Sequence, residues 1–265
     1  MTIKIIVCTK QVMDPETPAS AFNINPSDNT VMATPGIPPV VNGFDEIAVQ
    51  AALRIKDTQG ADITVLSAGD NFVMDIMKKP LSMGADQMTL IDDPLCQKTD
   101  AFGTARILAA AIKKIGAYDL ILCGRQASDW DNAHVPIGIA EFLELPCITV
   151  AQSIEITKDG VVVERTLTTG YEVVEASLPA VVTITNELGE PRYPTLRGIM
   201  SASRKSPTVW STCDIGLDAT DLTPKVKLIK LYLPPNDQDC VVVEGEDESD
   251  AGRNLALLLR QEKLI

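Results

Sequence analysis

The chain has few of the residues that metal and hydrolase sites require. His134 is its only histidine, and its six cysteines never stand at CxxC spacing. This disfavours zinc, haem and iron–sulfur centres, so we predict no metal site. No GxSxG motif is present to partner His134 in a Ser-His-Asp triad, and we predict no catalytic residues. Because most cysteines lie in or beside apolar runs, we expect buried thiols in a reducing compartment.

Positive charge is also scarce. Lys and Arg total 23 against 36 Asp and Glu, which gives a formal net charge of -13 over 265 residues. Such a chain repels polyphosphate, so we predict no nucleic-acid partner and no docking on an anionic membrane. No apolar run approaches the roughly 18 residues that span a bilayer, and the apolar part of the N-terminus is too short for a signal peptide. We therefore expect a cytoplasmic protein without a membrane span.

Two common nucleotide-binding fingerprints are missing as well. No GxGxxG follows a predicted strand, and no GxxxxGK[ST] occurs anywhere. A bound nucleotide would therefore be held by a different arrangement of loops. An ATP-dependent ligase of similar sheet architecture would need a Gly/Ser loop after the first strand. The chain has TKQVMDPE there, which sets that class aside.

The first 150 residues alternate between short β-branched runs and amphipathic stretches. The predicted strands are 3–8, 62–67, 88–91, 118–123 and 147–150, and the predicted helices are 45–58, 72–83, 100–115 and 135–143. Apolar strands that alternate with helices indicate a parallel sheet covered on both faces. Pro80 lies inside the second helical stretch, where we expect a kink or a break.

The pattern changes after residue 150. Short strands over 153–156, 161–167 and 173–175 predict an antiparallel addition, and a buried strand over 180–185 is expected to rejoin the main sheet. Beyond Lys205, frequent prolines and a thin apolar pattern predict an extended arm that ends in a helix over 249–261 and packs on a partner. We thus predict an α/β fold with a doubly wound, mostly parallel sheet over 1–205 and an extended C-terminal arm over 206–265.

Ligands of open parallel sheets bind beyond the carboxyl ends of the strands, where the strand order reverses. Four segments are expected there: 8–10, 42–45, 67–69 and 124–136. The last segment, GRQASDWDNAHVP, opens onto a helix whose amides suit a phosphate. Asp129 and Asp131 suit ribose hydroxyls or helix caps better, and Trp130 is expected to stack on a ligand or to pack under a partner. The alternative is that these segments are ordinary βα loops with capping residues, with His134 structural.

Several motifs in the same order carry a family resemblance. They are IIVCTKQVMD, NGFDEIAVQAALRIKD, TVLSAGD, LSMGAD, DLILCGRQASDWDNAHVPIGIAEFLELP and LPAVVTITNELGEPRYPTLRGIMSASRK. Along nearly its whole length the chain resembles the beta subunit of electron-transferring flavoproteins. The resemblance implies an α/β fold that binds an adenine nucleotide. It also implies a heterodimer with an alpha subunit that carries FAD, onto which the C-terminal arm packs, and a partner of the acyl-CoA dehydrogenase type.

The resemblance also implies functional residues. The implied nucleotide contacts are Cys8, Asn42, Gly43, Phe44, Asp45, Ala68, Gly69, Gly124, Arg125, Gln126, Ala127, Ser128, Asp129, Trp130, Asp131, Asn132, Ala133, His134 and Val135. The implied partner-recognition loop spans 191–205, with Tyr193, Leu196, Ile199 and Met200 as docking residues. A leucine presented on a proline-bounded loop fits an anchor that enters a pocket of the partner. The alternative is that Leu196 and Ile199 cap the core.

The family has two branches. One stores AMP in this subunit as a structural filler and keeps FAD in the alpha subunit. The other holds a second FAD here and bifurcates electrons from NADH, with ferredoxin or flavodoxin as the low-potential partner. GRQASDWD and the following IAEFLELP resemble the bifurcating branch, although its members generally carry Gln and Gly where this chain has His134 and Pro136. A non-redox adenine-nucleotide-binding regulatory protein is the rival from a different class.

Overall fold

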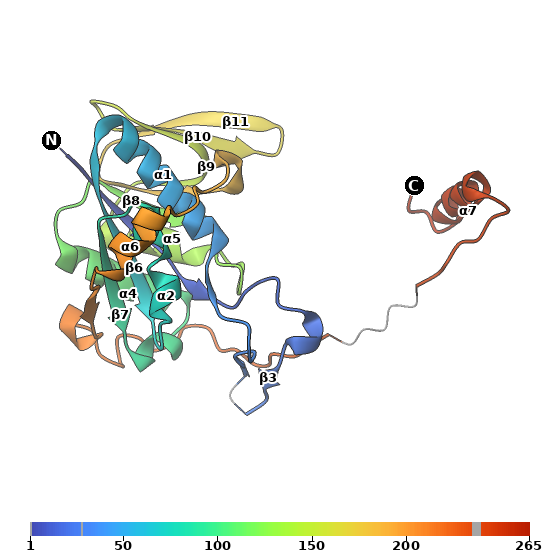
Figure 1. Ribbon diagram of the computed structural model, residues 1–265, viewed down its shortest axis with the longest axis horizontal. Helices are drawn as coiled ribbons and strands as arrows, with labels where there is room; N and C mark the ends of the chain where they lie inside the picture. The colour runs from blue at the N-terminus through green and yellow to red at the C-terminus, as the bar shows by residue number, and fades with distance from the viewer. Residues whose placement is uncertain (1, 28, 235–239) are drawn as a thin grey trace. The chain divides into compact units, whose positions relative to one another are not determined.

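The computed structural model describes residues 2–27, 29–234 and 240–265. The chain divides into two units, Met1–Ile229 and Lys230–Ile265 (Figure 1). The first unit extends beyond the boundary predicted after residue 205. The reason is that β13 (Thr208–Trp210) pairs in parallel with β7 (Gln87–Asp92) and so joins the main sheet. The second unit contains α7 (Glu248–Gln261), close to the helix predicted over 249–261.

Within the described residues, nine strands form one sheet in the order β11-β10-β9-β12-β8-β1-β6-β7-β13. Besides β7 and β13, these strands are β1 (Ile3–Cys8), β6 (Ala61–Gly69), β8 (Leu120–Gly124), β9 (Cys147–Ile156), β10 (Val161–Leu167), β11 (Gly170–Ala176) and β12 (Ala180–Ile184). Strand β1 pairs in parallel with both β6 and β8, whereas β9, β10 and β11 pair antiparallel. This confirms the predicted α/β class, with its mostly parallel sheet and antiparallel addition.

The remaining elements are short or cover the sheet. They are the strands β2 (Gln11–Val12), β3 (Ile24–Asn25), β4 (Thr30–Val31) and β5 (Val40–Val41), the 3₁₀ helices η1 (Ala19–Ala21), η2 (Pro94–Gln97), η3 (Asn186–Leu188) and η4 (Cys213–Ile215), and the helices α1 (Gly43–Gln59), α2 (Met74–Met77), α3 (Lys79–Met83), α4 (Ala101–Ile115), α5 (His134–Leu143) and α6 (Leu196–Ser203). The small ladders β2–β5 and β3–β4 were not predicted, because two-residue strands leave no periodic signal.

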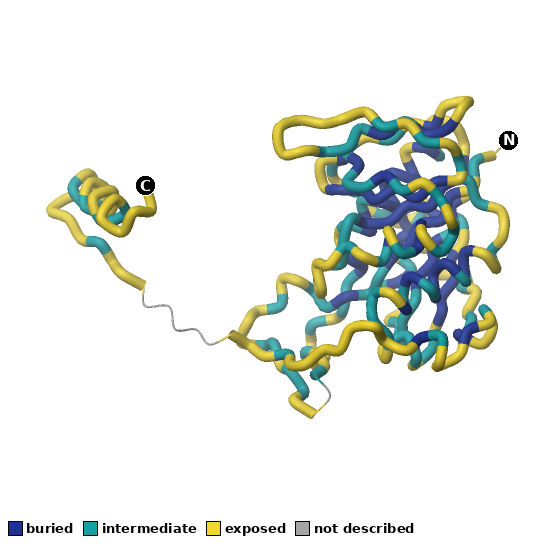
Figure 2. Tube along the Cα trace, turned by 180° about the vertical axis from the view of Figure 1, so that it is seen from behind, coloured by how far each residue is buried: buried dark blue, intermediate teal, exposed yellow. Residues whose placement is uncertain are grey.

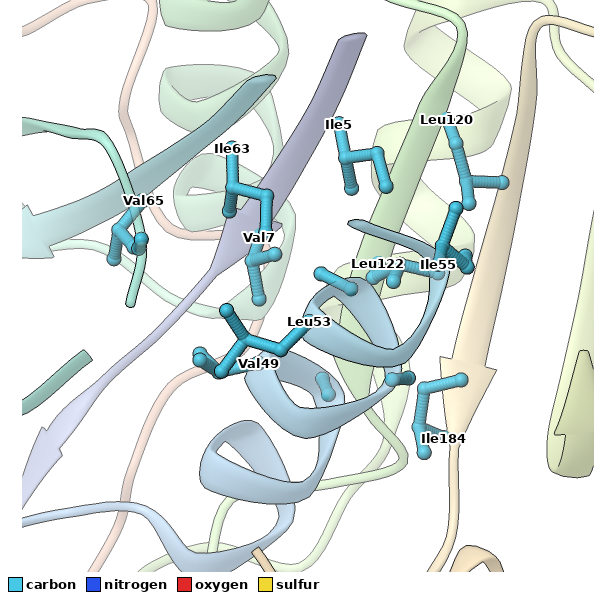
Figure 3. Close-up of a cluster of buried hydrophobic side chains, with 14 of the residues drawn as sticks. Ile5, Val7, Val49, Leu53, Ile55, Ile63, Val65, Leu120, Leu122 and Ile184 are labelled. Atoms are coloured by element: carbon cyan, nitrogen blue, oxygen red, sulfur yellow. The ribbon is translucent and has the colours of Figure 1, made fainter. Parts of the chain in front are cut away.

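Helices cover both faces of the sheet. Side chains of α1 and α3 pack on one face, and side chains of α4 and α5 pack on the other. Figure 3 shows Val49 and Leu53 of α1 beside Val7 of β1 and Ile63 of β6. All four of these residues are at most 2% exposed. Figure 2 shows the same pattern along the chain, since buried segments gather in the sheet and in the helices that cover it.

Local chemistry sets where these helices begin and end. Asp100 is the N-cap of α4, where its side chain accepts a hydrogen bond from the Gly103 amide. Gly116 closes the same helix at a φ of 96°, a value that glycine adopts without strain. The helix predicted over 72–83 is broken at Lys78 into α2 and α3, since Pro80 cannot donate its amide to the preceding turn.

Strand β9 pairs with two neighbouring strands, β12 and β10, which the sequence pattern did not predict. Segments 147–150 and 153–156, predicted as separate strands, are one strand that bends at Val150, whose φ is 57°. Its first part pairs in parallel with β12, and its second part pairs antiparallel with β10. The bend lets one strand join the parallel sheet to the antiparallel addition.

The structure also bears on the expectations about membrane-spanning helices and cysteine burial. In residues 2–27, 29–234 and 240–265, no helix has the length and apolar character needed to cross a membrane. The cysteines are less uniformly buried than the apolar runs suggested. Cys8 and Cys123 are buried, but Cys213 and Cys240 are exposed, because the segments that follow residue 205 pack less against the core.

Candidate functional site

The candidate site lies where the strand order reverses. The chain passes from β1 to β6 and β7 on one side, then returns to β8 on the other side of β1 (Figure 1). The loops that follow β1 and β8 therefore run in opposite directions from the carboxyl edge of the sheet. The space between two such loops is the usual ligand crevice of these folds. Cys8 and Cys123 are direct neighbours at this edge. Hydrogen bonding to Cys8 and burial raise the pKa of the Cys123 thiol well above its usual range, so it stays protonated.

Asn42 ties the start of α1 to the loop after β8. Its side chain is fully buried, and Nδ2 donates to the carbonyl of Gln126 at 2.8 Å while Oδ1 accepts from the amide of Ser128 at 3.1 Å. Its own amide donates to the carbonyl of Lys10 at 2.9 Å. One buried side chain thus connects segments 8–10, 42–45 and 124–136, which the sequence analysis placed at the same edge.

Asp45 lies deeper in the same corner and is 7% exposed. Its Oδ2 accepts from the amide of Lys10 at 2.8 Å, and its Oδ1 accepts from the amide of Gly124 at 3.2 Å. Burial raises the pKa of this carboxyl from 3.8 to about 7, although the hydrogen bonds from Asn42, Lys10 and Gly124 lower it. A Cβ on Gly124 would lie 2.4 Å from the same Oδ1, so the close approach requires glycine.

Charged and aromatic side chains line the rim of the site. Lys10 Nζ pairs with Asp129 at 2.6 Å and so joins the end of β1 to the loop after β8. The Arg125 guanidinium lies over the Phe44 ring, 5.1 Å from its centroid. Other rim contacts lie within the loop itself, as in the 2.7 Å hydrogen bond that Gln126 Nε2 donates to Asp131 Oδ1.

The loop enters α5 through a strained turn. Asp131 and Ala133 adopt φ values of 50° and 53°, in the left-handed region that residues other than glycine rarely occupy. Such backbone strain clusters at ligand sites. His134 is the first residue of α5, is exposed, and donates its amide to Asn132 Oδ1 at a long 3.4 Å. Trp130 is 55% exposed, so the part of the chain that the structure describes covers the indole only in part.

Some implied contacts lie on the other side of β1. Ala68 and Gly69 end β6, where Gly69 accepts a hydrogen bond from the amide of Asp93, and no described hydrogen bond joins them to the loop after β8. Segment 8–10 is predicted to lie at this edge, and within it a nucleotide contact is predicted only for Cys8. The buried Thr9 hydroxyl has no hydrogen-bond partner among the described residues, which leaves a polar atom free for a ligand at this edge.

A cavity of about 380 Å³ adjoins the corner. Its lining comes from the start of α1, the loop after β8 and two loop segments: Pro15, Asn42, Gly43, Phe44, Glu46, Ile47, Ser128, Glu190 and Pro191. Four of these residues belong to the implied nucleotide site. The hollow is open to solvent, and its lining mixes apolar residues with Asn42, Ser128 and two glutamates.

The implied docking residues form a separate, exposed group. Tyr193 is 92% exposed and Leu196 is 75% exposed, while Ile199 and Met200 are each about half exposed. The predicted loop contains a helix, because Thr195 caps α6 by accepting from the Gly198 amide at 3.0 Å. Leu196 is the first residue of that helix and does not cap the core of this chain.

Polar contacts with α1 hold the segment that precedes α6. The Arg192 amide and Nε both donate to Gln50 Oε1 at 3.0 Å, and the Arg192 guanidinium pairs with Asp57 at 2.5 Å. Four residues before Arg192, the Leu188 carbonyl accepts a hydrogen bond from the Arg54 guanidinium of α1 at 2.9 Å. Helix α1 therefore contacts the candidate corner at its first turn and the segment 188–192 along its later turns.

Comparison with known proteins agrees with this geometry. Residues 29–215 match the family model described as the electron transfer flavoprotein domain. The Caffeyl-CoA reductase-Etf complex subunit CarD of Acetobacterium woodii is 34% identical over 99% of this chain and 100% of its own length. The electron transfer flavoprotein subunit beta of Megasphaera elsdenii is 36% identical over 94% of each chain. Protein FixA of Azorhizobium caulinodans is 32% identical over 81% of this chain and 77% of its own.

Fold and site together define a doubly wound α/β protein with a ligand corner at its topological switch point. The matches narrow that class. The chain belongs to the electron transfer flavoprotein family, among its beta subunits, as the sequence motifs predicted. Membership in the beta group implies an alpha subunit as partner.

Proposed function

We propose that this chain and its alpha subunit pass electrons by way of FAD between an acyl-CoA dehydrogenase-type partner and other redox carriers. The flavin supplies the redox chemistry when it is bound. The residues of this chain bind and orient the nucleotide and present a docking surface. No bond-making side chain is needed for that role. The Cys8 and Cys123 thiols at the corner are buried, and the Cys123 thiol is kept protonated.

We further propose that the nucleotide held by this subunit is FAD. The supporting observation is the cavity of about 380 Å³ that shares Asn42 and Ser128 with the nucleotide corner. A dinucleotide would have room to extend from the corner into this space. The Phe44 side chain and Ile47 offer apolar contacts to a flat ring system there.

The residues present fit an adenine nucleotide. The Thr9 hydroxyl, without a partner among the described residues, can bond to a polar ligand atom at the end of β1. Asp129 and Asp131 suit ribose hydroxyls, which donate to carboxylates. The Val135 amide in the first turn of α5 would donate to a phosphate, as amides at helix N-termini do. These groups would hold the nucleotide, while Asn42 keeps the loop in place.

We propose that the protein bifurcates electrons from NADH. One relative belongs by name to a caffeyl-CoA reductase-Etf complex, and the motif GRQASDWD resembles the bifurcating branch. The low-potential product would go to a ferredoxin or flavodoxin, with NAD as a further ligand of the complex. The test is NADH-dependent reduction of ferredoxin that occurs only when a higher-potential acceptor is also present. Ferredoxin reduction without that acceptor would contradict coupled bifurcation.

A nucleotide count tests the cofactor proposal directly. The heterodimer is denatured, and the released FAD and AMP are separated by chromatography and quantified per protein. We expect two FAD and no AMP. One FAD with one AMP would assign the chain to the other branch, in which AMP fills this subunit. That alternative has one observation in its favour, since Pro136 in the first turn of α5 removes an amide that a diphosphate could use. A colourless preparation without nucleotide would contradict the electron-transfer role.

Two surfaces are proposed for protein partners. The exposed apolar residues of α6 would contact the dehydrogenase, with Leu196 as the anchor. The unit Lys230–Ile265 would pack on the alpha subunit, because α7 buries none of its described residues although Leu255 and Leu257 are apolar and exposed. A chain that ends at Ile229 should keep its sheet but fail to co-purify with the alpha subunit. Normal heterodimer formation by that chain would contradict this assignment.

A further inference from the structure

The Asp45 carboxylate lies inside the corner and is 7% exposed. It accepts amides from the ends of two neighbouring strands, Lys10 after β1 and Gly124 at the end of β8. Each carboxylate oxygen takes one of these amides. Because Asp45 belongs to the first turn of α1, one side chain fixes the relative positions of β1, β8 and α1.

We propose that Asp45 is a positioning residue that makes nucleotide binding at this site depend on pH, because only its ionised form holds both strand ends in the binding geometry. This inference rests on the proposed nucleotide site. An ionised carboxylate is acceptor-only, with two equivalent oxygens for the two amides. A protonated carboxyl keeps one good acceptor and gains an O–H donor. One buried amide then loses its partner, which is costly away from water.

The geometry indicates which contact would open first. The hydrogen bond from the Gly124 amide to Asp45 is the longer of the two, 3.2 Å against 2.8 Å for the bond from the Lys10 amide. Gly124 also begins the loop that carries most of the implied nucleotide contacts. A Cβ at this position would collide with the Asp45 oxygen, so carboxylate and loop are in close contact with no intervening side chain. Protonation at Asp45 therefore acts on the first residue of the nucleotide loop.

The surroundings place this titration near neutral pH. The titratable groups around Asp45 are Cys8 at the end of β1, Lys10 just after it, Cys123 in β8 and Glu46 in α1. Burial raises the pKa of Asp45 to about 7 against the opposing effect of the Lys10 charge. The Cys123 thiol stays neutral, and Glu46 is paired with Lys79 at 2.5 Å.

The experiment measures binding of ADP-ribose to the heterodimer after dialysis has removed the nucleotide of this subunit. ADP-ribose contains the diphosphate found in FAD and lacks the phosphomonoester of AMP, which titrates near pH 6. The parent protein of this experiment and both of its variants carry His134→Gln. Without a histidine in this chain, a pH dependence near neutral pH is not due to its imidazole. Asp45→Asn removes the carboxyl under study.

Asp119→Asn is the matched control. Asp119 accepts the Lys4 amide at 2.8 Å, so it too joins the regions of β1 and β8 through a backbone amide, but at the opposite edge of the sheet and exposed to solvent.

We expect the parent to bind ADP-ribose about fivefold more tightly near pH 8 than near pH 6, as follows if binding lowers the pKa of Asp45 by about one unit from about 7. Asp119→Asn should keep that profile, and Asp45→Asn should give weak binding that is the same at both pH values. A flat profile in the parent, tighter binding near pH 6, or an unchanged slope in Asp45→Asn would each overturn the inference.

A second measurement does not depend on the Asp45 variant folding. Calorimetric titration near pH 7 in two buffers of different ionisation enthalpy counts the protons exchanged when ADP-ribose binds. We expect proton release, since binding favours the ionised carboxylate, and no release or net uptake would overturn the inference. Absence of ADP-ribose binding at every pH would overturn the proposed nucleotide site and this inference with it, whereas binding without a pH profile overturns this inference alone.

Discussion

The corner at the carboxyl ends of β1 and β8 and the helix α6 are built by opposite means. In the corner, the buried polar side chains of Asn42 and Asp45 bond to backbone groups, and Asn42 has zero exposure. In α6, apolar side chains stand in solvent, as with Leu196 at 75% exposure. Buried polar groups are costly unless they are fully bonded, so they fix one geometry. Exposed apolar groups contribute little to the fold and are available for association. The first arrangement suits a small ligand, and the second suits a protein partner.

The largest expected loss of stability comes from Gly124→Ala. The new Cβ would meet the Asp45 carboxylate at 2.4 Å and the backbone of Phe44 at 2.7 Å, neither of which can move freely. We expect a loss of about 3 kcal/mol in the free energy of unfolding, together with loss of the nucleotide. Chemical denaturation measures the first, and chromatography of released nucleotide measures the second. Gly43→Ala is the stability control, because its Cβ meets nothing within 4 Å; an equal loss there would contradict the steric argument.

Asn42→Ala should cost somewhat less. It leaves the Gln126 carbonyl and the Ser128 amide without their buried partner, which we expect to lower the free energy of unfolding by about 2 kcal/mol. Nucleotide content after gel filtration should fall as well. The exposed Asn132 provides the comparison, since Asn132→Ala should lower nucleotide content while thermal unfolding stays the same. Full nucleotide occupancy in both variants would show that this loop does not hold the ligand.

The corner should also make stability depend on pH. The pKa of Asp45 is about 7 in the folded chain and near 3.8 when unfolded, so the folded state binds the extra proton between these values. The stabilising effect is fully present below pH 3.8 and is lost as the pH rises through about 7. Thermal unfolding of the wild type should lose this contribution over that window, and Asp45→Asn should remove it. The pKa of the Asp93 carboxyl is lowered, so its contribution to the free energy of unfolding is lost as the pH falls. The difference between Asp45→Asn and the wild type at each pH therefore gives the contribution of Asp45.

The smallest effect on stability is expected for Leu196→Ala. Because the side chain is exposed, thermal unfolding should not change, whereas association with the dehydrogenase should weaken by about 1–3 kcal/mol. Leu188 precedes the same segment but is 6% exposed, so Leu188→Ala should destabilise the fold. A destabilised Leu196→Ala protein that still passes electrons at the normal rate would remove α6 from the docking surface.

The sequence alone determined the alternating elements and the edge of the sheet at which the site lies. The apolar strands and the helical periodicity of α1, α4 and α5 are local properties, and parallel connections bring their strand ends to one edge. Pro80 marked a helix break for an equally local reason. The family motifs likewise depend only on residues and their order, and the comparisons confirmed them.

Tertiary structure alone decided what each site residue does. Asp45 was expected as a nucleotide contact, yet its oxygens are taken by amides of residues 10 and 124, which no local pattern reveals. The pairing of β13 with β7 moved the limit of the first unit to Ile229 because a three-residue strand gains its stability from a neighbour distant in sequence. The exposure of Leu196 was open for the same reason, since burial depends on what packs against a side chain. Periodicity fixes which elements form, whereas long-range contacts decide which groups are buried, bonded or left free.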